Sequence, residues 1–450
     1  MKFDYPQDKI FIETRAETLT FGEFSAKVAE ISANIASQYS ADQFIAINAA
    51  SPLNFLLDYF AIIESGKIAV LLNSKLPDDT LDMQMKSIGC RVVSKNHCLH
   101  EHFSRLPQIA LRDISACCVI FTSGSSGSSK AIVHGEGALI ASANNQIKRL
   151  GITPDDRYLL ALPLYHVGGL AVAYRSLLAG ARLQIAEDFG HPYSDVEYFR
   201  PSHASFVGVQ LQRLLDEKVA GSTAFDNFKG ILLGGSAIRE SLKCSALAQK
   251  LPCYYGYGST ETCSAICVAD SSQPIDSSGL SFDDCEIVIS AIGEILVKSP
   301  SLALGSISDG EFHPITDSDG YFHTHDCGTY SQTEGLRVIG RIDRMFVSGG
   351  ENVYPEEIEC ALLAIPQVSQ AAVIAVADAE FGHVAVAFIR QPTSNLPFDD
   401  IRKELRQTLP NYKIPKHFFD FPPKYHETGI KVNRQFLGEY LISHDFDVLK

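Results

Sequence analysis

The sequence of 450 residues contains no tryptophan and four methionines, and basic side chains are fewer than acidic ones. Its 38 lysines and arginines against 53 aspartates and glutamates give a formal net charge of −15. Long-range electrostatics therefore oppose nonspecific binding to nucleic acid or to an anionic membrane. We expect neither among its partners, and any polyanionic ligand must be held by local groups.

The sequence also lacks a Cys-x-x-Cys pair, an apolar leader and a long clean apolar run. Its eleven cysteines are scattered among apolar residues, which favours reduced and mostly buried thiols. The most apolar region, 158–183, is interrupted by His166, Arg175 and several glycines, so no stretch supplies the ~18 apolar residues of a spanning helix. The start, MKFDYPQDKIFIETRAE, carries acidic residues and a proline where a secretory signal needs an apolar core. We expect a cytoplasmic protein.

Apolar periodicity predicts an amphipathic helix at about 19–39. The apolar positions recur at spacings of three and four: Phe21, Phe24, Val28, Ile31 and Ile35. Thr20 and Glu23 fit a capping box at its start.

Short β-rich runs follow this helix, separated by segments long enough for further helices. They are FIAINA, KIAVLLN, CCVIFTS, RYLLALPL, RLQIAE, HASFVG and GILLGG. This alternation predicts an α/β fold of βα units around packed, largely parallel sheets. After about residue 280 shorter β-like pieces predict a β-rich subdomain, and a composition shift near 340 precedes a small α+β domain. We expect an N-terminal domain at 1–342 and a C-terminal domain at 343–450.

The stretch FTSGSSGSSK, at 121–130, predicts a phosphate-binding loop directly behind an apolar strand. Glycines permit close backbone approach, while hydroxyls and one lysine supply donors for an anion. The residues concerned are Thr122, Ser123, Gly124, Ser125, Ser126, Gly127 and Lys130. A flexible surface linker is the alternative. The Walker pattern GxxxxGK[ST] is absent.

Residues 121–134 resemble the phosphate-loop signature of the adenylate-forming superfamily, which comprises acyl-CoA synthetases, peptide-synthetase adenylation domains and luciferases. Further stretches match the family in the same order: LPLYHVGG, LLGGSAI, YGYGSTET, GEILVKSPSLALG, DGYFHTHDCG, VIGRIDRMFVSGGENVYPEEIE and GIKVNR. Within the family, the compact length, ADAEFGH and GIKVNRQ resemble a CoA ligase branch of menaquinone biosynthesis.

The resemblance implies ATP, Mg²⁺ and coenzyme A as ligands and assigns residues to each. Tyr257 would face adenine, Thr260 would lie near the acyl and phosphate oxygens, and Glu261 would bind Mg²⁺. Gly234, Gly235 and Ser236 would line the adenine edge. Asp326 would accept hydrogen bonds from the ribose hydroxyls, with Arg341 as its partner. Taken alone, both YGSTE and LLGGSAI also fit simple turns after strands.

The resemblance implies that the small domain is mobile and rotates about a hinge at Asp343. Rotation would bring Gly349 and Gly350 to the pantetheine channel. Lys431 would bridge the attacking carboxylate and the α-phosphate. The family usually writes Gly-Lys-Ile-x-Arg, whereas here Ile430 separates Gly429 from the lysine. Lys413 and Lys416 are nearby competitors, and a solvated lysine is the alternative.

His166, by resemblance, is an aromatic gate beside the carboxylate pocket, while a core histidine is the alternative. Arg175 lies in an apolar helix-like run, where a surface arginine with a buried stem is the usual explanation. An aromatic acid with a second carboxylate would instead need a fixed cationic fork, and arginine suits that task.

HTHDC, at 323–327, also invites a metal interpretation. His323, His325 and Asp326 could ligate zinc, but no partner pair at typical spacing is present. The resemblance instead favours Asp326 as the ribose acceptor, with His325 in place of a usual glycine.

These observations predict an ATP-dependent ligase that joins a small carboxylic acid to CoA through an acyl-adenylate. Two alternatives stay open: an enzyme that loads a carrier-protein thiol, and a catalytically silent nucleotide-binding protein. A homo-oligomer is also left open.

Overall fold

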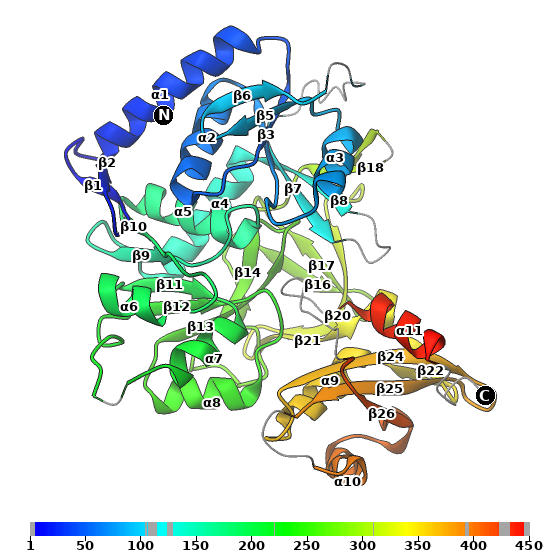
Figure 1. The fold of residues 1–450 in the computed structure, drawn as a ribbon. Helices are drawn as coiled ribbons and strands as arrows, with labels where there is room; N and C mark the ends of the chain where they lie inside the picture. Colours follow the sequence, from blue (N-terminus) through cyan, green and yellow to red (C-terminus); the bar gives the residue numbers. More distant parts are fainter. Residues whose placement is uncertain are drawn as a thin grey trace.

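The computed structural model describes residues 5–103, 106, 115–123, 129–219, 221–308, 310–391, 396–422 and 433–444. Two large sheets with their helices form the N-terminal part. A smaller α+β unit, whose own sheet is covered by helices, lies beside it (Figure 1). No helix in these ranges is both long enough and apolar enough to cross a membrane.

The first large sheet has nine strands, in the order β15-β14-β13-β12-β11-β9-β10-β1-β2. They are β1 (Ile10–Glu13), β2 (Thr18–Thr20), β9 (Arg157–Leu160), β10 (Arg182–Ile185), β11 (His203–Phe206), β12 (Gly230–Leu233), β13 (Cys253–Ser259), β14 (Ser264–Ala269) and β15 (Leu280–Ser281). Its interior, from β1 to β13, is parallel, and the strands at both edges are antiparallel.

The second large sheet has eight strands, in the order β19-β18-β8-β7-β4-β3-β5-β6. They are β3 (Phe44–Ile47), β4 (Ile68–Leu71), β5 (Val92–Lys95), β6 (Cys98–Glu101), β7 (Ala116–Ser123), β8 (Ser129–Gly135), β18 (Gly305–Ser308) and β19 (Glu311–Pro314). Only β5, β3, β4 and β7 run parallel. The prediction of largely parallel sheets therefore holds for the interiors, whereas chain reversals at the edges add antiparallel strands.

Helices cover both faces of these sheets. They are α1 (Phe21–Gln38), α2 (Pro52–Glu64), α3 (Asp78–Ser87), α4 (Glu136–Leu150), α5 (Val167–Ala179), α6 (Tyr193–Phe199), α7 (Gly208–Asp216) and α8 (Glu240–Ala248). Buried residues of α1, α2, α4 and α5 pack between the two sheets, while α3 covers the outer face of one sheet and α6, α7 and α8 that of the other. The green strands and helices in Figure 1 show this outer layer.

A four-stranded antiparallel sheet follows, in the order β16-β17-β20-β21, and confirms the β-rich texture after residue 280. Its strands are β16 (Glu286–Ile289), β17 (Glu294–Lys298), β20 (Phe322–Ser331) and β21 (Gly335–Arg341). A short 3₁₀ turn, η1 (Ile342–Arg344), then leads into the C-terminal elements.

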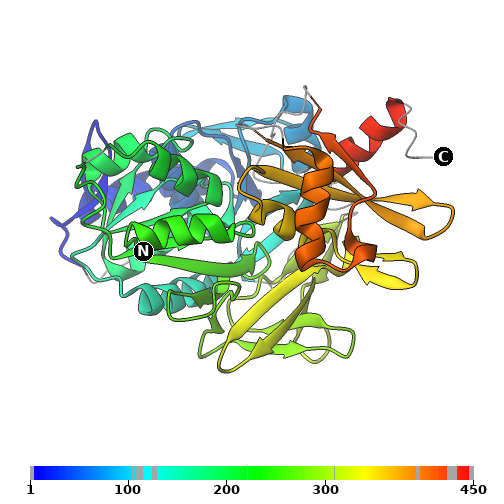
Figure 2. The ribbon, with the colours of Figure 1, turned by 90° about the horizontal axis from the view of Figure 1, so that it is seen from below.

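The C-terminal elements form their own sheet and their own cores. The strands are β22 (Phe346–Ser348), β23 (Glu351–Val353), β24 (Gln370–Asp378), β25 (Gly382–Arg390) and β26 (His417–Asp420), and the helices are α9 (Pro355–Ala364), α10 (Phe398–Thr408) and α11 (Arg434–Ser443), with η2 (Asn411–Lys413) between them. Helices α9 and α10 pack on one face of the sheet and α11 on the other. Figure 1 shows these orange and red elements grouped apart from the blue and green ones, and in Figure 2 they lie on the right of the view. The boundary at 342/343 stays a prediction.

The predicted first helix is confirmed, including its start. Thr20 accepts a hydrogen bond from the Glu23 N–H, and the Glu23 carboxylate accepts one from the Thr20 N–H. Such a reciprocal cap satisfies two donors that the first turn leaves without helical partners. The buried positions include Phe21, Phe24, Val28 and Ile35, as the periodicity predicts.

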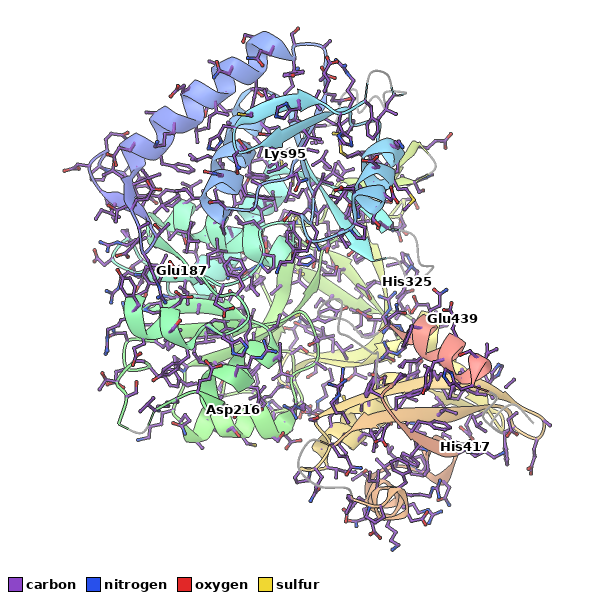
Figure 3. All side chains as sticks on the ribbon, viewed as in Figure 1. Lys95, Glu187, Asp216, His325, His417 and Glu439 are labelled. Atoms are coloured by element: carbon purple, nitrogen blue, oxygen red, sulfur yellow. The ribbon has the colours of Figure 1, made fainter. Side chains whose placement is uncertain are left out.

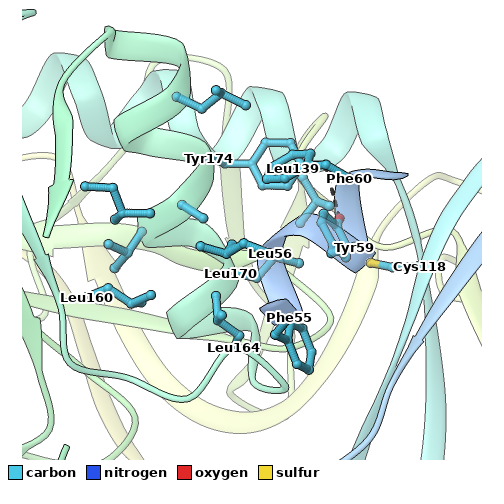
Figure 4. Packing of buried hydrophobic residues seen from close by; sticks show 14 of the residues in the cluster. Phe55, Leu56, Tyr59, Phe60, Cys118, Leu139, Leu160, Leu164, Leu170 and Tyr174 are labelled. Atoms are coloured by element: carbon cyan, nitrogen blue, oxygen red, sulfur yellow. Dashed lines mark hydrogen bonds between the residues drawn. The ribbon is translucent and has the colours of Figure 1, made fainter. Parts of the chain in front are cut away.

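The core between the two large sheets contains a buried polar contact among apolar side chains. Tyr59 on α2 and Tyr174 on α5 lie with their hydroxyl oxygens 3.1 Å apart, and both side chains are almost fully buried (Figure 4). Phe60 packs against the Tyr174 ring at a centroid distance of 5.9 Å. The two hydroxyls therefore rely on each other, since water does not reach them.

We predict non-additive effects of removing these hydroxyls. Tyr59→Phe and Tyr174→Phe should each destabilise the fold by about 1–3 kcal/mol, because each leaves a buried hydroxyl without its partner. The double variant should lose less stability than the sum of the two, since no orphan hydroxyl remains. Urea unfolding of the four proteins measures the coupling, and strict additivity would contradict it.

Candidate active site

The predicted phosphate loop is the tip of a β-hairpin. Strands β7 and β8 are antiparallel, with Thr122 opposite Lys130, and the Thr122 hydroxyl donates to the Lys130 carbonyl oxygen at 3.4 Å. Lys130 is exposed. Gly124, Ser125, Ser126 and Gly127 lie outside the described residues, as does the side chain of Ser123. The pairing of these two strands places the residues that flank the loop, Thr122 and Lys130, next to each other.

The LLGGSAI and YGYGSTET stretches span the carboxyl ends of two neighbouring parallel strands, β12 and β13. Gly234, Gly235 and Ser236 come directly after β12, and Gly235 has a left-handed φ of 87° that favours glycine. Gly235 and Ser236 are exposed. Carboxyl ends of neighbouring parallel strands are where open α/β sheets bind ligands, so this edge is suited to a nucleotide.

A tight turn joins β13 to β14 and carries Thr260 and Glu261. Ser259 pairs with Ser264 across it, and a Cβ at Gly258 would overlap the Ser264 carbonyl oxygen. Cys263 and Ser264 are consecutive non-glycine residues with left-handed φ angles of 52° and 98°. Conformations of this kind cost of order 1–3 kcal/mol each, so the surrounding contacts must enforce the turn.

Tyr257, Asp326 and Arg341 form one contact group. The Tyr257 hydroxyl donates to Asp326 Oδ2 at 2.6 Å, and Arg341 Nη1 lies 3.5 Å from Asp326 Oδ1. Asp326 and Arg341 are direct partners in the β20–β21 ladder. Burial, together with the adjacent Asp326, raises the pKa of Tyr257, and burial raises the pKa of Asp326. The tyrosine therefore stays a neutral donor to the carboxyl group.

The same arginine holds the predicted hinge residue. Arg341 Nε and Nη2 donate to the two carboxylate oxygens of Asp343 at 3.0 and 2.8 Å. A residue that the sequence analysis missed, Glu356 on α9, accepts from the Arg341 backbone N–H at 3.4 Å and from Arg344 at 2.8 Å. Only the fold places α9 against β21, so no local pattern could reveal this contact.

His323 and His325 share a carboxylate that the sequence analysis also missed. Glu294, almost fully buried, accepts from the His325 N–H at 3.0 Å, and its other oxygen lies 3.1 Å from His323 Nδ1. His325, labelled in Figure 3, has a φ of 57°, the conformation that a glycine would supply most easily. Among the described residues, no cluster of three histidine, cysteine or acidic side chains is arranged to hold a metal ion.

His166 is exposed and precedes α5, so the core alternative is wrong. The Tyr165 ring packs edge-on against it at a centroid distance of 4.7 Å. A Cβ at Gly169 would overlap the carbonyl oxygens of Leu162 and Pro163, so glycine lets the chain fold back at this point.

Arg175 is 1% exposed, so the interpretation as a surface arginine is also wrong. Its Nε donates to the Ala171 carbonyl at 3.0 Å, and Nη1 donates to Tyr158 Oη at 2.6 Å and Ser205 Oγ at 3.2 Å. Burial lowers the pKa of Arg175. The third nitrogen, Nη2, makes no hydrogen bond with a described residue.

Lys431 lies outside the described residues, together with Gly429 and Ile430. Its two competitors are engaged in ion pairs: Lys413 with Glu357 at 2.6 Å and Lys416 with Asp378 at 2.5 Å. Gly349 and Gly350 connect β22 to β23 with left-handed φ angles of 60° and 91°. Phe381, 43% exposed, would be the nearest contact of a Cβ at Gly349.

The donor set around Thr260 and Glu261 fits a magnesium nucleotide. Both side chains are partly exposed, and neither makes a hydrogen bond or ion pair with a described residue. A carboxylate with unused oxygens is a ligand that Mg²⁺ prefers.

We predict a pH-dependent contribution of His323 to stability. Hydrogen bonds to Glu294 and Asp317 raise the pKa of His323 above 6.5, so its contribution is complete below pH 6.5 and is lost as the pH rises through the raised value. His323→Gln should lower the melting temperature at about pH 6 and have little effect at about pH 9. The exposed His313 serves as control; equal shifts at both pH values would contradict the prediction.

Comparison with known proteins places these features in a family. The family model described as "AMP-binding enzyme" matches residues 105–306, and the "AMP-binding enzyme C-terminal domain" matches 357–429. The 2-succinylbenzoate–CoA ligase of Escherichia coli K12 is 30% identical over 446 residues, covering 96% of each chain. The same enzyme of Haemophilus influenzae is 30% identical over 450 residues, covering 97% of this chain and 96% of that one.

Solved structures agree with the sequence comparison. An o-succinylbenzoate CoA synthetase from Bacillus subtilis, in complex with the acyl-adenylate intermediate OSB-AMP, superposes with a TM-score of 0.83 at 26% identity and covers 95% of both chains. Its complex with ATP and magnesium ion gives a TM-score of 0.78 at 26% identity, covering 92% of this chain and 93% of that one. The chain therefore belongs to the AMP-binding enzyme family, in the group that contains the 2-succinylbenzoate–CoA ligases.

Proposed function

We propose that the protein is an AMP-forming acid–thiol ligase that converts 2-succinylbenzoate, ATP and CoA into 2-succinylbenzoyl-CoA, AMP and pyrophosphate, a step of menaquinone biosynthesis. The observation that carries the proposal is the contact group of Tyr257, Asp326 and Arg341 beside the Thr260–Glu261 turn. The aromatic ring of Tyr257, the proposed ribose acceptor Asp326 and the carboxylate of Glu261 then belong to one site. The chain is related over nearly its full length to such ligases.

In the first half-reaction, a substrate carboxylate oxygen attacks the α-phosphorus, and the bond from that phosphorus to the oxygen bridging to the β-phosphorus breaks. Pyrophosphate leaves with the electron pair. Lys130, Thr122 and the Ser123–Gly127 loop hold the β- and γ-phosphates, while Lys431 neutralises charge between the carboxylate and the α-phosphate. Thr260 donates to the phosphate or acyl oxygens. Mg²⁺, when bound by Glu261, offsets the negative charge of the triphosphate.

In the second half-reaction, the CoA thiolate attacks the acyl carbonyl carbon, and AMP leaves with the electrons of the broken carbon–oxygen bond. Rotation about Asp343 would remove Lys431 and bring the β22–β23 turn to the channel. Gly349 and Gly350 lack side chains that would obstruct the pantetheine arm there. His166, at the start of α5, would gate the thiol's approach.

Arg175 is proposed to bind the second carboxylate of the acid. Tyr158, Ser205 and Ala171 hold its Nε and Nη1 groups, which fixes the plane of the guanidinium. The remaining Nη2 group can donate to a ligand carboxylate, and burial strengthens such a charge-assisted bond.

A cytoplasmic location is part of the proposal. ATP and CoA are cytoplasmic co-substrates, and all eleven cysteines are free thiols. Free CoA is favoured over a carrier-protein thiol as the acceptor. The related proteins are named as CoA ligases, and their alignments cover 96% and 97% of this chain.

One assay separates the three functions considered. The protein is incubated with each of a panel of organic acids, first with ATP and Mg²⁺ and then with CoA added. Mass spectrometry measures the acyl-AMP, acyl-CoA and AMP that form. A CoA ligase releases pyrophosphate with 2-succinylbenzoate and forms AMP and the thioester when CoA is added. An adenylate that CoA does not convert into a thioester, or no adenylate at all, would reject the proposal.

We predict that Lys431→Ala separates the two half-reactions. Pyrophosphate release should fall by about 10²–10³-fold, because the charge at the α-phosphate is no longer neutralised. Thioester formation from supplied acyl-AMP should stay near the wild-type rate. Lys416→Ala, which removes only an ion pair with Asp378, is the matched control. Equal losses in both half-reactions would count against the role.

We predict that Arg175→Lys alters substrate preference. Lysine keeps the positive charge but not the fork, so the kcat/KM ratio of 2-succinylbenzoate to 2-butanoylbenzoate should fall about 10–100-fold. Arg182→Lys, at a partly buried arginine paired with Glu13, controls for the loss of a guanidinium. An unchanged ratio in a folded Arg175→Lys protein would reject the assignment.

A further inference from the structure

A buried thiol–imidazole contact joins two segments that are far apart in the sequence. His134 Nδ1 lies 3.1 Å from Cys263 Sγ, and both side chains are fully buried. His134 belongs to β8, four residues beyond Lys130, and Cys263 ends the turn that carries Thr260 and Glu261. The contact therefore bridges the hairpin of the phosphate loop and the Thr260–Glu261 turn.

Further hydrogen bonds hold the same turn from its other sides. Ser142 on α4 donates to the Cys263 carbonyl oxygen at 2.5 Å, and Gln146, one helical turn later, donates to Ser142 Oγ at 3.1 Å. Thr262 Oγ1 accepts from the Ser259 N–H at 2.8 Å and lies 2.7 Å from the Ser264 carbonyl oxygen. All three side chains are buried.

The backbone makes a second bridge between the two segments. The Ala303 N–H donates to the Glu261 carbonyl oxygen at 2.7 Å, and the next N–H, of Leu304, donates to the Val133 carbonyl oxygen at 2.9 Å. This strand connection sets the distance between the backbones but not the conformation of the turn. The left-handed Cys263 and Ser264 residues need further restraints. The Ser142 and Thr262 hydrogen bonds hold their backbone, whereas the Cys263 side chain packs in the core and makes its hydrogen bond, among the described residues, with His134.

We propose that His134 and Cys263 are positioning residues for the magnesium triphosphate. Their contact holds the Thr260–Glu261 turn in register with the phosphate-loop hairpin, so that ligands from both segments meet the same polyphosphate. The inference rests on the proposed function, since it takes the roles of Thr260 and Glu261 from there. It assigns no direct contact with the nucleotide to either residue.

The position of the bridge predicts which ligand it affects. Adenine and ribose are assigned to Tyr257, Asp326 and Arg341, none of which makes a hydrogen bond or ion pair with His134 or Cys263 in the described part of the chain. AMP has neither the β- and γ-phosphates nor the metal that they carry. Loss of the bridge should therefore weaken ATP with Mg²⁺ much more than AMP, to whose single phosphate only Thr260 of this turn is assigned, whereas a general structural defect would weaken both equally.

The test is calorimetric titration of the full-length protein with ATP and Mg²⁺, and separately with AMP, in the absence of any acid. Cys263→Ala should raise the Kd for ATP with Mg²⁺ about tenfold, the order found for residues that orient metal ligands, with a much smaller rise of the Kd for AMP. Cys263→Ser, which keeps a hydroxyl partner for the imidazole, should restore most of the affinity.

Three further variants keep the test decisive. Cys263→Gly accepts the left-handed conformation without strain, so it should fold and yet show the same selective loss. Cys267→Ala removes an equally buried thiol from the adjoining strand and should leave both Kd values unchanged. In the double variant with Cys263→Ala, His134→Leu should cause no further rise of the Kd for ATP with Mg²⁺, because both substitutions remove the same interaction.

Three outcomes would overturn the proposal and are distinguishable. If the wild type binds both nucleotides and folded Cys263 variants bind ATP with Mg²⁺ as tightly, the bridge has no positioning role and the proposed function stands. An equal loss of AMP and ATP affinity would likewise reject the positioning role alone. If the wild type binds neither nucleotide, the proposed function fails and the inference fails with it.

Discussion

The apolar core between the two large sheets is the constraint on which the rest depends. Each sheet buries its inner face against α1, α2, α4 and α5, so neither sheet can shift without opening that core. The phosphate-loop hairpin leaves one sheet and the β13–β14 turn leaves the other. Close packing thus fixes strand β8 and the β13–β14 turn, which belong to different sheets, next to each other, and interiors of this density transmit small displacements rather than absorb them.

Polar contacts between the sheets further restrain the positions of the candidate site residues. The Tyr257–Asp326 bond joins the nine-stranded sheet to the four-stranded one, and the Glu294 carboxylate fixes the backbone that precedes Asp326. Each of these groups is partly or fully withdrawn from water, so breaking one contact leaves an unsatisfied partner rather than a solvated one. These contacts therefore restrain the Asp326 side of the candidate site.

Local patterns were sufficient to predict the first helix with its cap, the seven quoted strands and the α/β class, because these depend on periodicity and turn chemistry within a few residues. Family motifs brought together Tyr257, Asp326 and Arg341, which the structure confirms as neighbours; their ligand roles stay predictions. Glu294, Glu356 and the His134–Cys263 pair could not be foreseen, since each depends on strand pairing or helix packing between distant segments. Arg175 was ambiguous for a related reason: α5 is buried on all sides, so its sequence has no polar face that would tell a surface arginine from an interior one.

The planar guanidinium of Arg341 donates to two carboxylates. Its Nε and Nη2 groups donate to Asp343, and its Nη1 group lies near Asp326. Because the guanidinium plane is rigid, a rotation that improves the contact with one carboxylate must weaken the contact with the other. Any molecule whose binding draws the guanidinium toward Asp326 thereby changes the torsional freedom at residue 343. By thermodynamic reciprocity, twisting the chain there alters the affinity for that molecule by the same factor.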